Sequence, residues 1–219
     1  MERAMKRWLR GLLVGALTGL VLGCQDRQPT SAPSTSNAGD LHARASASGG
    51  ATEVRWDIVS NAPPTDFNVR PGGSASALAN DGSQITLTGS GTFVAPASGG
   101  ATSAVTGGGT WTTTGPSGSG SGTYEVTGLV RWEEAPGSLP SAATDLVGEA
   151  ADARPGLVVL RIAYSDGSRG TLTVSCHLAG TPDGVFEGVT ASKGFVDYWN
   201  RAAPVANVNA NRTLFHVEQ

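Results

Sequence analysis

The residues best suited to chemistry are one adjacent pair, Cys176 and His177. A thiolate beside an imidazole base is the arrangement that cysteine nucleophiles use. The pair lies in an alternating run, however, and successive side chains of a strand point to opposite faces, so these two cannot meet on one face. Cys176 shares its face with Leu172, Val174 and Leu178. We therefore interpret it as a buried structural thiol.

The remaining acid, base and metal-ligand candidates are scattered. His177 and His216 each fall on the polar face of a strand run and could hold a metal ion together with an acid, but no ligand pair has the spacing of a dedicated site. Glu133 and Glu134 are sequence neighbours at a strand end, which is typical of a solvated terminus. We predict no catalytic residue, no metal and no cofactor. The enzyme alternative would use His177 with Glu133.

Non-covalent binding is the second chemistry that the sequence offers. Lys193 is the only lysine after residue 6, and it lies in a segment, residues 182–200, that is dense in aromatic and charged side chains. This segment either plugs one end of the domain or forms a rim that faces a ligand. The tryptophans are otherwise core candidates. The predicted ligand-binding residues are Trp111, Trp132, Lys193, Tyr198 and Trp199.

The N-terminus has the pattern of an export signal, residues 1–23. Four basic residues come before an uncharged apolar stretch, residues 11–22, which is shorter than the ~20 residues of a spanning helix. The next residues, Val21-Leu22-Gly23-Cys24, resemble the lipobox of bacterial lipoproteins. The resemblance implies cleavage after Gly23, diacylglycerol on Cys24, and acylation of the new N-terminus by a chain such as palmitate. A plain secretory signal and an uncleaved anchor helix remain the alternatives.

The location follows from the same resemblance. Two or more acyl chains anchor a protein stably in a membrane. Gln25 stands where Asp is the signal for inner-membrane retention, so the resemblance implies the outer membrane if the host is diderm. The expected location is the extracytoplasmic cell envelope. Residues 24–51 then read as the lipidated cysteine and a flexible tether rich in Ser, Ala, Pro and Gly.

Charge and cysteine content exclude several classes of protein. Without the signal the chain has 11 Lys+Arg and 17 Asp+Glu, a net charge of −6, which excludes a basic nucleic-acid groove. The chain has two cysteines, and lipid occupies Cys24, so Cys176 has no partner for a disulfide. The domain must therefore be held together by packing.

Residues 52–219 show short alternating runs separated by Gly, Pro, Asp and Ser. Period-2 alternation of β-branched and aromatic residues predicts half-buried strands around residues 54–58, 84–88, 124–132, 158–164 and 172–178. In the third run we expect Val130 and Trp132 to share one face with Tyr124. The sequences Asn80-Asp81-Gly82 and Ser165-Asp166-Gly167-Ser168 predict turns. The best helix candidate, residues 192–199, is short.

The pattern Gly-x-Gly-Thr-aromatic occurs at residues 89–93, 107–111 and 120–124. We interpret each copy as a strand leaving a tight bend, in which glycine permits positive φ or close backbone approach and the aromatic packs inward. A phosphate-binding loop is rejected, since neither Lys-Ser/Thr nor a helix follows. The run of bends predicts one antiparallel meander, most simply a β-barrel, with a β-sandwich as the alternative.

In architecture the domain loosely resembles calycin-type and allene-oxide-cyclase-like barrels, which implies an apolar cavity but no reaction. The predicted function is a membrane-anchored module that binds a small apolar ligand or a protein partner. A structural envelope protein without ligand is the first alternative, and a barrel enzyme using His177 and Glu133 is the second.

Overall fold

The computed structural model describes residues 52–62, 66–95, 104–205 and 207–218, and within these ranges it contains strands and no helix. The expected all-β class is confirmed. The signal peptide, Cys24 and the tether lie outside the described residues. The strands are β1 (Thr52–Ala62), β2 (Asp66–Arg70), β3 (Ala75–Leu78), β4 (Gln84–Leu87), β5 (Ser90–Ala95), β6 (Gly108–Thr114), β7 (Gly120–Glu134), β8 (Thr144–Asp145), β9 (Ala153–Arg154), β10 (Gly156–Tyr164), β11 (Arg169–Cys176), β12 (Gly188–Lys193), β13 (Val196–Tyr198), β14 (Asn200–Arg201) and β15 (Asn207–Glu218).

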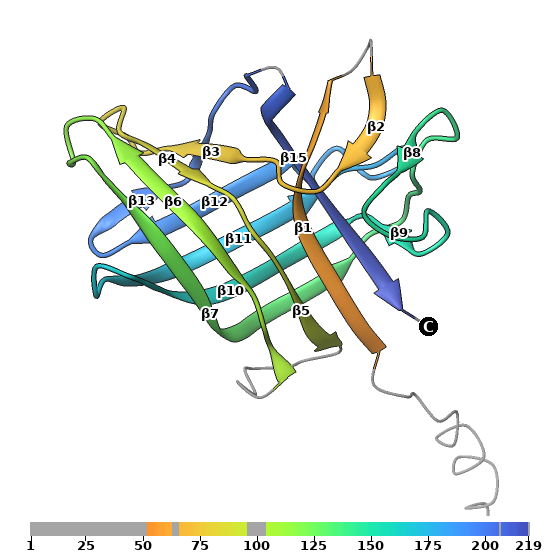
Figure 1. Ribbon diagram of the computed structural model, residues 1–219, viewed down its shortest axis with the longest axis horizontal. Coiled ribbons are helices and arrows are strands. Elements are labelled where there is room, and N and C mark those ends of the chain that lie inside the picture. Colours follow the sequence, from red (N-terminus) through yellow and green to blue (C-terminus); the bar gives the residue numbers. More distant parts are fainter. Residues whose placement is uncertain (1–51, 63–65, 96–103, 206, 219) are drawn as a thin grey trace, which may run out of the picture. The chain divides into compact units, whose positions relative to one another are not determined.

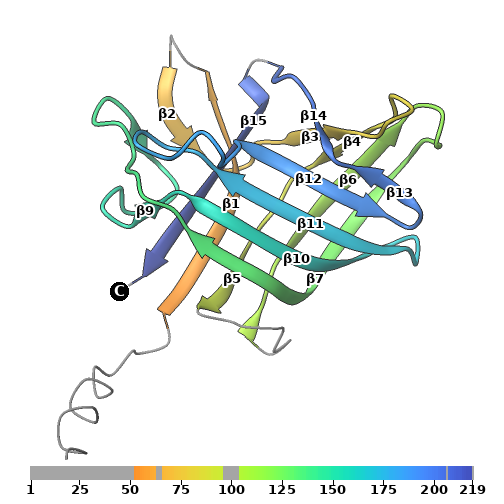
Figure 2. The same ribbon diagram turned by 180° about the vertical axis from the view of Figure 1, so that it is seen from behind.

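The strands form one strongly curved sheet (Figures 1 and 2). Its order is β13-β12-β11-β10-β7-β6-β5-β1-β15-β9, so the first and last long strands, β1 and β15, lie side by side. Off this path, β3 pairs with β4 and with β14, which brings the β13–β14 end of the sheet beside the β3–β4 hairpin. The described ladders leave the sheet open, so a closed barrel stays a prediction.

One strand pair departs from the expected antiparallel pattern. Strand β8 pairs with β2 in parallel, and the sheet is therefore mixed. The cause is the connection between β7 and β10, residues 135–155, which leaves the meander. Within it, β9 pairs with β15, and Leu146, just after β8, donates a backbone hydrogen bond to the carbonyl of Val69 in β2. This connection crosses the outer face of β1, where Asp57 and Val59 are both 2% exposed. Strand β1 is consequently covered on both faces.

The inward faces of most strands agree with the alternation in the sequence. Val158, Leu160 and Ile162 of β10 are at most 1% exposed. Strand β7 differs, because two register shifts against β10 add extra residues, as β-bulges do. Leu129 therefore faces the core, whereas Val130 is 38% exposed, so the prediction of an inward Val130 was wrong.

The Gly-x-Gly-Thr-aromatic repeat marks close approach between β5, β6 and β7. Gly89 has φ +151°, and a Cβ there would lie 2.2 Å from the Tyr124 hydroxyl oxygen. The three repeat aromatics, Phe93, Trp111 and Tyr124, are all buried. The proposed reading of the repeat, close backbone approach followed by an inward aromatic, is confirmed.

The segment proposed as a short helix is instead a hairpin. Residues 192–199 form the end of β12, a turn and β13, with Ser192 opposite Asp197 and Lys193 opposite Val196. Gly194 at the turn has φ +59°. This candidate segment is extended because pairing with β11 and β13 satisfies its backbone groups in the sheet, which agrees with the expectation of at most one short helix.

Candidate ligand-binding site

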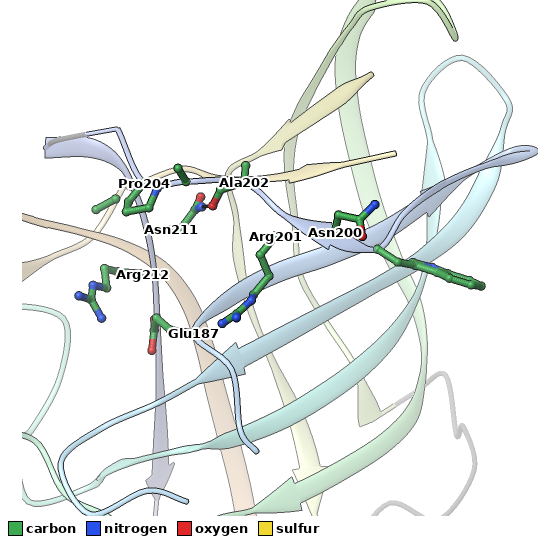
Figure 3. A pocket seen from close by; sticks show the side chains of 10 residues that line it. Glu187, Asn200, Arg201, Ala202, Pro204, Asn211 and Arg212 are labelled. Atoms are coloured by element: carbon green, nitrogen blue, oxygen red, sulfur yellow. Dashed lines mark hydrogen bonds between the residues drawn. The ribbon is translucent and has the colours of Figure 1, made fainter. Parts of the chain in front are cut away.

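Two adjoining cavities open where β15 passes the connection between β11 and β12. The first has a volume of about 680 Å³, and its lining from β14, the residues after it, and β15 mixes apolar surface with charged and amide side chains (Figure 3). Its lining includes Glu187, Trp199, Asn200, Arg201, Asn211 and Arg212. We call this space the polar cavity. In Figure 3, Arg201 and Arg212 lie on either side of Glu187.

The second cavity is smaller, about 220 Å³, and mainly apolar. It lies among the ends of β1 and β2, residues 139–143, and the segment that follows β11. Its apolar lining consists of Val59, Phe67, Val69, Leu139, Pro140, Ala143, Leu178, Ala179 and Leu214. We call this space the apolar cavity. Glu187 and Arg212 line both cavities, so they form the shared wall.

The Glu187 carboxyl joins β15 to the end of β11, between which the described sheet has no ladder. Its Oε1 accepts a hydrogen bond from the Thr213 backbone N–H at 2.7 Å, and its Oε2 accepts one from the His177 backbone N–H at 2.6 Å. Burial raises the pKa of Glu187 to about 7, although these two hydrogen bonds and the charge of Arg212 act in the opposite direction. The carboxyl is therefore a structural acceptor that titrates near neutral pH.

The two arginines of the polar cavity lack partners. Within the described ranges, no hydrogen bond or ion pair engages the guanidinium group of Arg201 or Arg212. Three arginines elsewhere do have carboxylate partners: Arg55 with Asp57, Arg131 with Glu133, and Arg154 with Glu134. Arg212 acts on Glu187 only through its charge, so the polar cavity presents guanidinium donors that no described residue engages.

Two polar groups from the sheet lie at the apolar cavity. The His177 ring donates from Nδ1 to the Val185 carbonyl at 2.7 Å, so in a neutral ring Nε2 is the acceptor. Asn61 also lines this cavity, and its Oδ1 is a buried acceptor with no hydrogen-bond partner among the described residues. These groups offer an otherwise apolar space a few polar contacts, a combination typical of small-molecule sites.

The five predicted ligand-binding residues do not gather at one place. Trp199 lines the polar cavity and is 68% exposed. Trp132 packs inside the sheet, with its ring centroid 4.7 Å from that of Phe215. Trp111 and Tyr198 are buried.

Lys193 interacts with the domain's own side chains. Its Nζ lies 4.2 Å from the centre of the Trp111 ring and 5.1 Å from that of Tyr164. It also pairs with the Asp166 carboxylate, and this hydrogen bond lowers the pKa of Asp166. The lysine thus covers the aromatic cluster and is held by an acid of the β10–β11 turn.

The candidates for catalysis lie apart from one another. Cys176 is fully buried, and burial raises the pKa of its thiol well above the usual range. Glu133 is exposed and paired with Arg131, and it lines neither the apolar nor the polar cavity. His177 and His216 bond to different partners, Val185 and Asp145. Within the described residues, no cluster of three or more His, Cys, Asp and Glu side chains is arranged to hold a metal ion.

His216 belongs to a second buried polar cluster, on the outer face of β1 and β15. Its Nε2–H donates to Asp145 Oδ2 at 2.8 Å, and both side chains are at most 4% exposed. Arg55, opposite His216 in the ladder, donates from Nη2 to Asp57 Oδ1 at 2.9 Å. Burial raises the pKa of Asp57, although Arg55 acts to lower it. Residues 143–148 cover this cluster, which we call the covered cluster.

Sequence reasoning did not single out Glu187, Arg201 or Arg212 as site residues. Glu187 falls within the segment identified as dense in aromatic and charged residues, and this was the only signal. Nothing in its spacing links it to Arg212, because the two meet only where β15 passes the β11–β12 connection.

No helix among the described residues has both the length and the apolar character needed to cross a membrane. Comparison of the chain with protein-family models, with curated proteins and with solved structures finds no match.

Proposed function

We propose that the protein is a lipid-anchored, extracytoplasmic binding module of the cell envelope, attached through Cys24, whose β-rich domain takes a small ligand with an apolar part. The observation that carries this proposal is the apolar cavity, which is lined by Leu139, Leu178 and Leu214 and by Asn61, whose buried Oδ1 has no hydrogen-bond partner among the described residues. Most ligand sites combine an apolar lining with a few placed polar groups. The anchor rests on the lipobox resemblance.

The test is native mass spectrometry on the mature chain with Cys24→Ser, so that no acyl chain competes for the cavity. After incubation with an envelope extract, we expect an added mass that denaturation removes. The variant Ala143→Trp fills the apolar cavity and should lose this mass. Its matched control is Ala142→Trp, because Ala142 is exposed and does not line that cavity. A chain that stays free of ligand in extract, or an added mass that survives Ala143→Trp, would overturn the proposal.

The anchor is tested separately by the mass of the membrane-bound protein. Diacylglycerol and an amide-linked acyl chain on Cys24 should be lost together in Cys24→Ser, with release of the protein from the membrane fraction. A Cys24→Ser protein that still sediments with membranes would favour an uncleaved anchor helix.

A further inference from the structure

We infer that the ligand is an anionic amphiphile, with its apolar part in the apolar cavity and a carboxylate or phosphate head bound by Arg212 and Arg201. This inference rests on the proposed function and adds the chemical class of the ligand. It starts from the two guanidinium groups that have no partner among the described residues while they line a cavity.

The position of Arg212 defines where the head group would lie. Arg212 is partly buried and lines both cavities, so a ligand whose tail contacts Leu178 and Leu214 would place its next polar atoms at this side chain. Arg201 extends from β14 on the far side of Glu187 (Figure 3). A guanidinium group matches carboxylate and phosphate oxygens with two parallel hydrogen bonds.

Glu187 interacts with the charge of Arg212, but no described acid forms an ion pair or a hydrogen bond with either guanidinium group. Glu187 is the acid between the two arginines, but its two oxygens already accept backbone hydrogen bonds from His177 and Thr213. Asn211, the neighbour of Arg212, is also engaged, since its Oδ1 accepts from the Ser76 backbone N–H at 2.6 Å. The guanidinium groups therefore remain available in a chain whose net charge without the signal is −6.

Arg201 is exposed and stays hydrated, but a neutral apolar ligand would leave the partly buried guanidinium group of Arg212 without a hydrogen-bond partner. Burying an unpaired charge is costly, whereas a charge-assisted pair in a partly buried site is among the stronger polar contacts. The observations therefore favour an anion over a neutral molecule of the same size. Trp199 at the rim of the polar cavity is 68% exposed and would cover the head group from the solvent side.

The experiment compares three probes that share one tail: hexanoate, hexyl phosphate and 1-hexanol. Their affinities are measured by calorimetry or ligand-observed NMR on the mature chain with Cys24→Ser. We expect at least one anion to bind about tenfold or more tightly than the alcohol, and added salt to reduce this preference. The stronger of the two anions identifies the head group as carboxylate or phosphate.

Variants of the two arginines test whether these side chains cause the preference for an anion over 1-hexanol. In the double variant Arg201→Gln and Arg212→Gln, the anions should fall to the affinity of 1-hexanol, while 1-hexanol itself is unchanged. Arg131→Gln, at an exposed ion pair that lines neither cavity described above, should keep the full preference. Equal binding of all three probes, or a preference that survives the double variant, would overturn the inference but leave the proposed function intact. If none of the three probes binds while the extract still gives an added mass that Ala143→Trp abolishes, this result would also overturn the inference and leave the proposed function intact.

Discussion

Two groups of titratable side chains lie at different positions along β15, and they differ in how their charges are compensated. In the covered cluster, Asp145 is paired with His216, and Asp57 with Arg55, beneath residues 143–148. At the cavity wall, Glu187 is satisfied by backbone N–H groups, and Arg201 and Arg212 have no partner among the described residues. Removing one partner of a paired and covered charge is costly to a fold, whereas guanidinium groups left open at a cavity are available to a ligand. Arg212 and His216 lie four residues apart on the same face of β15, so under the proposed function two stretches of one strand face have different roles.

The largest expected effect is the loss of a partner in the covered cluster. Asp145→Asn removes the charge facing His216 and weakens acceptance from the Val147 and Gly148 backbone N–H groups, so we expect the free energy of unfolding to fall by about 3 kcal/mol. Chemical denaturation measures the change. Glu133→Gln, at an ion pair about 60% exposed on both sides, should cost less than about 1 kcal/mol. Equal losses in the two variants would show that the covered cluster has no special role in stability.

The free energy of unfolding should depend on pH through Glu187, with a change of about 3 kcal/mol. Its pKa in the folded protein is about 7, above its ordinary value of 4.5, so the folded state binds the proton more tightly than the unfolded state. The resulting stabilisation is complete below about pH 4.5 and is lost as the pH rises through about 7. The measurement is urea unfolding of wild type and Glu187→Gln across this range. A difference between the two proteins that does not change with pH would refute the raised pKa.

Protein stability should be sensitive to one methyl group added to residues 143–148, which lie over the covered cluster. A Cβ at Gly148 would lie 2.8 Å from His216 ring atoms, so Gly148→Ala must displace either the ring or residues 143–148. We expect a loss of about 1–3 kcal/mol in thermal or chemical unfolding. Gly184→Ala is the control, because nothing lies within 4 Å of its Cβ position, and it should change stability by less than about 0.5 kcal/mol. A Gly148→Ala protein as stable as this control would mean that the segment does not press on His216.

The smallest expected effect on stability is that of replacing Arg212 at the polar cavity. Arg212→Gln removes a guanidinium group that has no hydrogen-bond or ion-pair partner among the described residues, so the free energy of unfolding should change by less than about 0.5 kcal/mol. The same variant should weaken the binding of hexanoate or hexyl phosphate. If Arg212→Gln instead destabilises the protein as much as Asp145→Asn does, the covered cluster and the open arginines do not differ in their contribution to stability.

Local patterns explain which predictions about the fold succeeded. Alternation in residues 158–164 identified the inward face of β10, because a strand side chain points to the same face at every second residue. The Gly-Thr-aromatic repeat likewise encodes its own bends. Val130 was misplaced because a β-bulge depends on the register with a neighbouring strand. Residues 192–199 were misread because sheet pairing overrode a weak helical signal.

By itself the sequence determined the all-β class, the two turns at Gly82 and Gly167, and the burial of Cys176, since each depends on residues close together in the chain. Only the tertiary structure decided which distant residues contact β15. Asp145 and His216 are 71 positions apart, and Glu187 and Thr213 are 26 apart. Such contacts are set by strand order and by the path of residues 135–155 across β1, which short-range patterns do not encode. The covered cluster and the two arginines of the polar cavity could therefore be identified only from the folded structure.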